Sequence, residues 1–124
     1  MDKRQIISDY LMFLTLGDYN KITSLFSRNA VIISPLYGRI RAKKFYKDLL
    51  NDSKKSKIKL IDVFYNQTQM ALGYFKYDWI LKNNSSISFY GVDVFKFNKA
   101  GKIEEMRILY DTYPIRKSFN KLKK

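Results

Sequence analysis

The stretch from Ser86 to Thr112 constrains the fold more than any other part of the chain, because it predicts one long antiparallel hairpin. Two runs rich in β-branched and aromatic residues flank residues 98–102. Gly101 in this loop suits the positive φ that a short, bulged hairpin turn requires. Side chains alternate between the two faces of a strand, so one face of the first run carries Ile87, Phe89, Gly91, Asp93, Phe95 and Phe97. The pattern predicts a lone carboxyl group on an apolar sheet face.

Asp93 is therefore the first candidate for a functional residue. An ionised carboxylate on an apolar face is costly, so Asp93 must either find a hydrogen-bond partner or raise its pKa and stay neutral. The alternative is a reversed or bulged register, in which Asp93 faces water.

Length and composition narrow the chemistry. The 124 residues fit a single domain. The chain contains no Cys and no His, which excludes disulfides, thiolate nucleophiles, Ser-His-Asp triads and metal sites built from these ligands. Acid–base chemistry must come from carboxylates, Tyr or Lys. The sequence supports neither a metal nor a nucleotide cofactor, since Gly-rich phosphate loops are also absent.

Polar residues interrupt every apolar run. The first ten residues do not resemble a signal peptide, and no stretch approaches the roughly 20 apolar residues needed to span a bilayer. We therefore expect no membrane span and a cytoplasmic protein.

The chain is strongly basic, with 24 Lys and Arg against 11 Asp and Glu. Such a balance favours polyanions, for example nucleic acid or an acidic partner. The alternative is an ordinary, solvated Lys-rich surface. The charges gather in a central region and in a tail at about 114–124, at Arg41, Lys43, Lys44, Lys47, Lys54, Lys55, Lys57, Lys59, Arg116, Lys117, Lys121, Lys123 and Lys124.

Hydrophobic periodicity predicts helices over 4–16, 19–26 and 41–51 and strands over 30–34, 57–65 and 70–81, ahead of the hairpin. In the strand over 57–65, Ile58, Leu60 and Phe64 are expected to share a face. The strand over 70–81 places Ala71, Gly73, Phe75, Tyr77, Trp79 and Leu81 on one aromatic face, and the last strand places Met106, Ile108 and Tyr110 together.

The tail has Ile115, Phe119 and Leu122 at helical spacing. We expect a short amphipathic helix that docks on the domain or on a partner; a frayed terminus is the alternative. The element order α-α-β-α-β-β-β-β predicts an α+β fold in which a curved antiparallel sheet wraps around the N-terminal helices and forms a cone.

Two blocks carry a resemblance to a known family. Residues 10–38, from Tyr10-Leu-Met-Phe to Tyr37-Gly38, resemble the opening of the nuclear transport factor 2-like (NTF2-like) superfamily, in its SnoaL-like and ketosteroid-isomerase-like branch. Residues 92–107 resemble the final hairpin of that branch. The resemblance implies a cone-shaped pocket between sheet and helices in one domain over 1–124, and a homodimer formed through the outer sheet face.

The resemblance also implies site residues. Tyr10 and Asp93 match the two oxyanion-hole donors of ketosteroid isomerases, a Tyr hydroxyl and a protonated Asp. The general-base position, just before a Pro, is Ser34, which cannot accept a proton at neutral pH without a base beside it and so argues against isomerase chemistry of that type. SnoaL-type cyclases use a single Asp as acid and base, a role that Asp93 matches. The Arg that limonene-epoxide hydrolases carry two residues earlier is replaced here by Gly91.

The sequence thus leads to two functional hypotheses. The first is a pocket protein that binds a small, apolar, oxygen-bearing ligand, with or without an isomerase- or cyclase-like activity of Asp93 and Tyr10. The expected lining is completed by Phe13, Phe26, Ser34, Tyr37, Phe45, Phe75, Trp79, Phe89, Met106, Ile108 and Tyr110. The alternative is a non-enzymatic scaffold or interaction domain whose cone is filled by its own aromatic residues and whose basic surface binds an acidic partner or nucleic acid.

Overall fold

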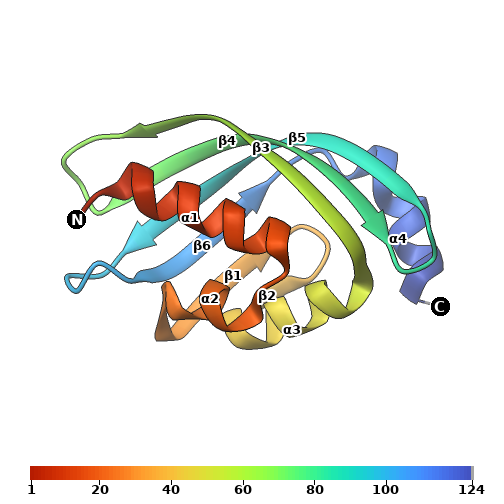
Figure 1. Ribbon diagram of the computed structural model, residues 1–124, viewed down its shortest axis with the longest axis horizontal. Helices are drawn as coiled ribbons and strands as arrows, with labels where there is room; N and C mark the ends of the chain where they lie inside the picture. Colours follow the sequence, from red (N-terminus) through yellow and green to blue (C-terminus); the bar gives the residue numbers. More distant parts are fainter. Residues whose placement is uncertain (124) are drawn as a thin grey trace.

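The computed structural model describes residues 1–123, and it forms an α+β cone (Figure 1). Lys124, the last residue of the predicted basic tail, lies outside the described residues. The elements in chain order are α1 (Lys3–Leu16), α2 (Tyr19–Ser24), β1 (Phe26–Ser34), β2 (Gly38–Arg41), α3 (Ala42–Asp52), β3 (Ser53–Tyr65), β4 (Met70–Leu81), β5 (Ser86–Phe97), β6 (Ile103–Leu109), a 3-10 turn (Tyr113–Ile115) and α4 (Arg116–Lys123).

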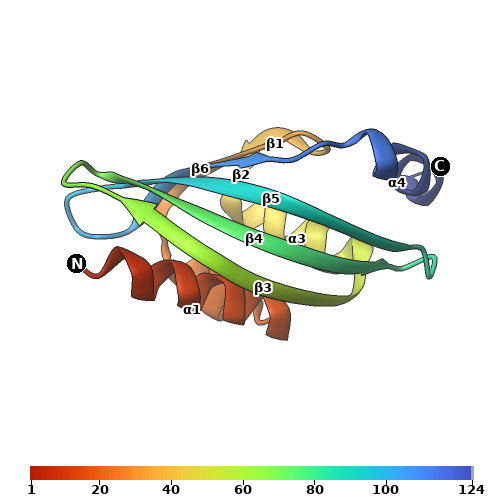
Figure 2. The ribbon, with the colours of Figure 1, turned by 90° about the horizontal axis from the view of Figure 1, so that it is seen from above.

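One six-stranded sheet organises the domain, in the order β2-β1-β6-β5-β4-β3. Neighbouring strands are antiparallel except β1 and β6, which run parallel. The long strands curve, and α1 and α3 lie along the concave side of the sheet (Figure 2). This arrangement confirms the predicted fold class.

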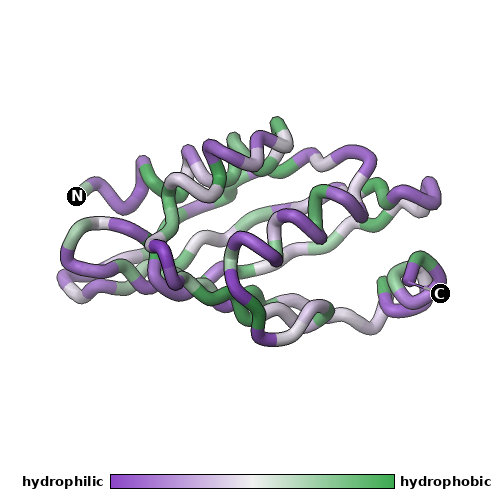
Figure 3. Tube along the Cα trace, turned by 90° about the horizontal axis from the view of Figure 1, so that it is seen from below, coloured by the Kyte–Doolittle hydropathy of each residue, from purple (hydrophilic) through white to green (hydrophobic). Residues whose placement is uncertain are grey.

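Local signals explain where the first helices begin and end. The Asp2 carboxylate caps α1 by accepting from the Gln5 N–H at 3.0 Å, and Gly17 ends the helix at φ 67°, a conformation that glycine adopts at little cost. Asp18 then caps α2 in the same way. Hydrophilic and hydrophobic residues alternate along the helices (Figure 3). Ile7, Leu11 and Leu14, which follow one another at helical spacing along α1, are buried.

The predicted hairpin is β5 and β6. Gly101 has φ 83°, and the Asn98 side chain accepts from the Lys102 N–H at 3.0 Å, which closes the loop. Ile87, Asp93, Phe95 and Phe97 are buried on the concave face. The alternative register, with Asp93 facing water, is therefore wrong.

Several predicted boundaries are wrong for reasons that lie elsewhere in the fold. Helix α2 ends at Ser24, not at residue 26, because Phe26 begins β1 and pairs with Ile103 of β6. Strand β3 begins at Ser53 rather than at residue 57, because Ser53 and Lys55 already pair with β4. The short strand β2 was not predicted; its charged residues have little β-propensity, and pairing with β1 holds it.

Strand β3 also breaks the predicted alternation. The register with β4 shifts between Leu60 and Asp62, which is the mark of a β-bulge. The extra residue reverses the faces beyond it, so Val63 is buried and Phe64 is 54% exposed. The expectation that Ile58, Leu60 and Phe64 share a face is therefore wrong for Phe64.

The C-terminal tail forms the predicted amphipathic helix and docks on the domain. Ile115 and Phe119 are buried. The ring of Phe119 packs edge-on against Tyr37, with 5.1 Å between centroids, and the Lys123 ammonium group pairs with the Asp52 carboxylate. Within residues 1–123, no helix is long and apolar enough to cross a membrane; the cytoplasmic location stays a prediction.

Candidate functional site

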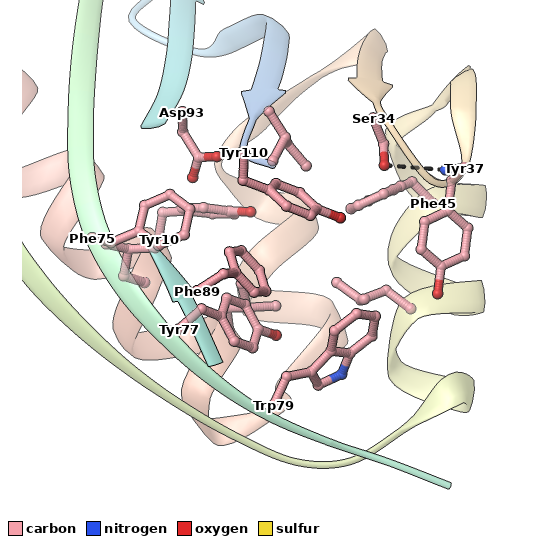
Figure 4. A pocket seen from close by; sticks show the side chains of 14 residues that line it. Tyr10, Ser34, Tyr37, Phe45, Phe75, Tyr77, Trp79, Phe89, Asp93 and Tyr110 are labelled. Carbon is pink, nitrogen blue, oxygen red and sulfur yellow. Dashed lines mark hydrogen bonds between the residues drawn. The ribbon is translucent and has the colours of Figure 1, made fainter. Parts of the chain in front are cut away.

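A cavity lies between the concave face of the sheet and helices α1 and α3 (Figure 4). Strands β4, β5 and β6 supply one wall, and the helices and the β1–β2 turn supply the other. The lining residues are Tyr10, Leu11, Leu14, Ser34, Tyr37, Phe45, Leu49, Phe75, Tyr77, Trp79, Phe89, Asp93, Ile108 and Tyr110.

The cavity is narrow because aromatic rings occupy much of the cone. The centre of a water molecule can move through about 40 Å³ of it, which is room for about three waters. In this conformation the cone has room for water but not for a ring, since an apolar cavity that binds benzene measures about 150 Å³.

Most of the predicted lining residues come together at this cavity, but three do not. Phe26 and Met106 are buried in the core without reaching it, and Phe13 is half-buried on α1 with the Lys21 ammonium group 5.6 Å from its ring. The prediction missed Leu11, Leu14, Leu49 and Tyr77 as lining residues. Alternation with Phe75 and Trp79 was a sufficient signal for Tyr77.

Asp93 is the most unusual group in the cavity. It is 3% exposed, and its Oδ1 atom has no hydrogen-bond partner anywhere in residues 1–123. It lies on the central strand β5, between Gly73 of β4 and Ile108 of β6. Burial raises the pKa of Asp93 well above the ordinary carboxyl value. Asp93 therefore keeps its proton at pH values where an exposed Asp has lost it, and a neutral carboxyl group can donate a hydrogen bond.

Gly91 shapes the wall beside Asp93. A Cβ atom on Gly91 would lie 2.7 Å from Cζ of Phe75 and 3.3 Å from the carbonyl oxygen of Leu109. The absence of a side chain thus lets the Phe75 ring lie against β5, next to the cavity. Gly91 is itself the residue two positions before Asp93, so this position carries no cationic side chain.

Tyr10 reaches the cavity, and its hydroxyl group pairs with that of Tyr46. The two hydroxyl oxygens lie 2.6 Å apart, and both residues are buried. One hydroxyl donates to the other, so the accepting hydroxyl keeps its own proton for a second hydrogen bond. Burial is the main cause that raises the pKa of Tyr10, and a charge on Tyr46 or Asp93 would raise it further. The helical periodicity over 41–51 did not predict this pair.

Removing either hydroxyl of this pair should cost stability. In the variant Tyr10→Phe the Tyr46 hydroxyl loses its buried partner, and in Tyr46→Phe the Tyr10 hydroxyl does; each should lower the free energy of unfolding by about 1–3 kcal/mol. The double variant should cost clearly less than the sum, because no orphaned hydroxyl remains. Urea unfolding of the four proteins tests this, and strict additivity would show that the two hydroxyls do not interact.

An aromatic stack forms the sheet side of the cavity. The rings of Tyr77 and Phe89 are nearly parallel with centroids 5.3 Å apart, and those of Phe89 and Tyr110 are 4.2 Å apart. Hydrogen bonds hold two members of this wall, because Tyr77 pairs with the Ser56 hydroxyl at 2.8 Å and the Trp79 indole N–H donates to Ser53 at 2.8 Å. Phe89 lies between Tyr77 and Tyr110, so the faces of its ring are covered and the wall offers the cavity an apolar aromatic surface.

Ser34 and Tyr37 lie at the turn after β1. The Ser34 hydroxyl oxygen accepts from the backbone N–H groups of Leu36 and Tyr37, both at 3.2 Å, and so organises the turn (Figure 4). The Tyr37 hydroxyl donates to Asp52 at 2.7 Å. Burial, followed by this contact with Asp52, raises the pKa of Tyr37. Neither residue supplies a free base to the cavity.

No cluster of three or more Asp or Glu residues that could hold a metal ion occurs in the part of the chain that the structure describes.

Comparisons with known proteins place the fold. No protein-family model matches the chain, and no curated protein matches it in sequence. Solved structures do match. An NTF2-like protein of unknown function from Cytophaga hutchinsonii superimposes with a TM-score of 0.74 at 13% identity, over 93% of this chain and 95% of that one.

Two further structures extend the likeness. The epoxide hydrolase/cyclase-like enzyme SalBIII, described with a role in pyran ring formation in the polyether salinomycin, gives a TM-score of 0.75 at 18% identity, over 86% of this chain and 88% of its own. A protein of ketosteroid-isomerase-like fold from Catenulispora acidiphila, in complex with trimethylamine, gives a TM-score of 0.77 at 9% identity, over 89% of this chain and 88% of its own.

The architecture and these likenesses define an α+β cone protein with a pocket between sheet and helices. The chain has the NTF2-like fold, with cyclase-like and ketosteroid-isomerase-like proteins among its structural neighbours. The resemblance seen in the sequence is thereby confirmed for the fold.

Proposed function

We propose that this protein binds a small, apolar, oxygen-bearing molecule in the cavity, and that Asp93 donates a hydrogen bond to an oxygen of that molecule. One observation carries the proposal: a buried carboxyl oxygen without a partner in residues 1–123 lies at a cavity walled by aromatic rings. An unpaired buried polar group costs about 1–3 kcal/mol. A ligand oxygen that accepts from Asp93 recovers this energy, and the aromatic stack supplies apolar contact.

Acid catalysis is a natural extension of this binding mode. A neutral carboxyl group beside a substrate oxygen can polarise a carbonyl or protonate a leaving oxygen. The cyclase-like neighbour supports a ring-forming reaction. Isomerisation is disfavoured, because Ser34, at the general-base position of an isomerase, accepts from two backbone N–H groups. When Tyr46 donates to the Tyr10 hydroxyl, Tyr10 keeps its own proton and can donate it to a substrate oxygen beside Asp93.

The binding proposal can be tested with 1-tetralone and tetralin, two bicyclic probes that differ by one carbonyl oxygen. Trp79 is the single Trp of the chain and lines the cavity, so nuclear magnetic resonance of its indole N–H reports occupancy. Wild type should bind 1-tetralone in preference to tetralin. In the variant Asp93→Leu this preference should fall by about tenfold, which is the effect of one lost hydrogen bond. Equal binding of both probes by wild type would refute the role of Asp93.

We also propose that the outer sheet face forms a homodimer interface. The outer patch, defined as Phe64, Leu72, Tyr74, Val92, Val94 and Leu109, joins β3 to β6 through cross-strand pairs. Phe64, Leu72, Tyr74 and Leu109 are 54%, 38%, 36% and 49% exposed. Lys96, Glu105 and Arg107 flank the patch with both signs of charge, so a two-fold related copy can set opposite charges together.

A charge at the centre of the outer patch should therefore yield a monomer. Sedimentation of Leu72→Lys is expected to give half the mass of wild type, with the affinity for 1-tetralone retained because Leu72 lies on the other side of the sheet from the cavity. Wild type that sediments as a monomer at tens of micromolar would contradict the interface.

Polyanion binding is the second candidate function, and one contact favours it. Lys59 lies directly across from Lys76 on the outer face, and like charges in such a pair repel each other. The Asp78 carboxylate, 4.0 Å from Lys76 Nζ, offsets part of that repulsion, and an anion bound between the lysines would offset the rest. Binding to a single-stranded oligonucleotide that weakens with salt, and a reduced salt slope in Lys59→Gln, would support this function; no measurable binding at low salt would exclude it.

A further inference from the structure

Four tyrosines line the cavity, and the hydroxyl groups of three are engaged by the protein. Tyr10 pairs with Tyr46, Tyr37 donates to Asp52, and Tyr77 pairs with Ser56. Tyr110 differs. Its hydroxyl group forms no hydrogen bond to any of residues 1–123. Burial is the main cause that raises the pKa of Tyr110, followed by the neighbouring Tyr77 and Asp93, and no hydrogen-bond partner contributes.

The position of Tyr110 follows from the register of the last two strands. Ile108 of β6 pairs with Asp93 of β5, and Tyr110 is two residues further, on the same face. In Figure 4 its ring runs away from the Asp93 carboxyl group, and its hydroxyl group lies on the side of Phe45. The cavity thus has two free polar groups at separate places on its wall.

An apolar stack of rings holds one of these two groups. The ring of Phe89 stacks on Tyr110 at 4.2 Å and on Tyr77 at 5.3 Å. This stack holds the Tyr110 ring in place, so its hydroxyl group is held in position before a ligand arrives, which lowers the entropy cost of binding.

We infer that the ligand of this cavity carries two oxygen functions, one bound by Asp93 and the other by the Tyr110 hydroxyl group. This inference rests on the proposed binding function and adds the substrate class. The Asp93 end takes an acceptor such as a carbonyl oxygen, because a neutral carboxyl group donates. The Tyr110 end takes a hydroxyl or a carbonyl oxygen, because a phenol group both donates and accepts.

The size of the cavity limits the length of such a molecule. Its interior has room for about three water molecules, since the centre of a water can move through about 40 Å³ of it. A ring system therefore enters only if the aromatic lining moves aside, and one or two fused rings with an oxygen at each end require less movement than four rings. Removal of the second oxygen should leave the Tyr110 hydroxyl without a partner in the bound state and weaken binding.

The test compares 1-tetralone with 6-hydroxy-1-tetralone, which adds a hydroxyl group at the end opposite the carbonyl. Calorimetric titration of wild type should show about tenfold tighter binding of the hydroxy compound, the effect of one hydrogen bond. Tyr110→Phe keeps the stacked ring and should bind the two compounds equally. Tyr74→Phe, the same change on the outer face, should retain the tenfold preference.

The possible results separate this inference from the proposal beneath it. If both compounds bind wild type and Tyr110→Phe with the same preference, the role of Tyr110 is overturned while the pocket function stands. If neither compound binds wild type, the pocket function fails and the inference fails with it. Should Tyr110→Phe not fold, 6-fluoro-1-tetralone replaces it as the test on wild type: equal affinity of the fluoro and hydroxy compounds would overturn the inference.

Discussion

Replacement of Asp93 by asparagine is expected to raise the free energy of unfolding at neutral pH, and the gain should grow with pH. Burial raises the pKa of Asp93 in the folded protein, whereas in the unfolded chain it has the ordinary value of about 3.9. Between these two pKa values the native state holds a proton that the unfolded state has released. Wild-type stability therefore falls as pH rises through this window.

An asparagine at this position does not titrate, so the variant escapes that loss. The difference in unfolding free energy between Asp93→Asn and wild type should increase by about 1.4 kcal/mol per pH unit from near pH 4 up to the native pKa, and then level off. Urea unfolding at a series of pH values measures it. Asp93→Leu is the companion variant, since it also lacks the titrating group and should show the same slope with a different offset. A difference that does not change with pH would mean that Asp93 is ionised in the folded protein.

Replacement of Gly91 by alanine is the second change with a large expected effect. The new methyl group would lie 2.7 Å from Cζ of Phe75, closer than carbon atoms approach, so the Phe75 ring must move. Overpacking of this kind costs about 1–3 kcal/mol. The Leu109 carbonyl at 3.3 Å closes off the other side, and the ring is therefore expected to shift into the cavity and weaken 1-tetralone binding by more than tenfold.

A double variant separates this mechanism from general damage to β5. Phe75→Leu removes the ring that the methyl group would strike, so Gly91→Ala should cost much less in the Phe75→Leu background than alone. The measurements are unfolding free energy and 1-tetralone affinity for all four proteins. Independent, additive effects would show that the alanine acts through some contact other than Phe75.

The cavity carries two polar groups, Asp93 and Tyr110, among the aromatic residues of its wall. Burial raises the pKa of Asp93, and its Oδ1 atom has no partner within residues 1–123 because Gly73 and Ile108, its cross-strand neighbours, offer no polar side chain. A bound oxygen would offset the stability cost of this unpaired atom. Such a cost at a binding site fits the trade-off between stability and function.

The sequence by itself determined the hairpin and the face of each central strand, and it left the burial of Asp93 as one of two alternatives. These follow from short-range rules, because alternation along a strand and the turn at Gly101 depend only on neighbouring residues. The caps at Asp2, Gly17 and Asp18 are equally local. The family resemblance predicted a curved sheet, and the structure has one.

The tertiary structure alone decided which hydroxyl groups are free. Tyr10 and Tyr46 are 36 positions apart and meet at 2.6 Å, and Tyr37 meets Asp52 across the β1–β2 turn and α3. No periodicity in the sequence encodes such pairs. The bulge in β3, the strand β2 and the docking of α4 on Tyr37 also depend on partners far along the chain. For this reason the sequence could point to Tyr10 and Asp93, and only the packed structure showed that Tyr46 pairs with Tyr10 and that the Tyr110 hydroxyl group has no partner within residues 1–123.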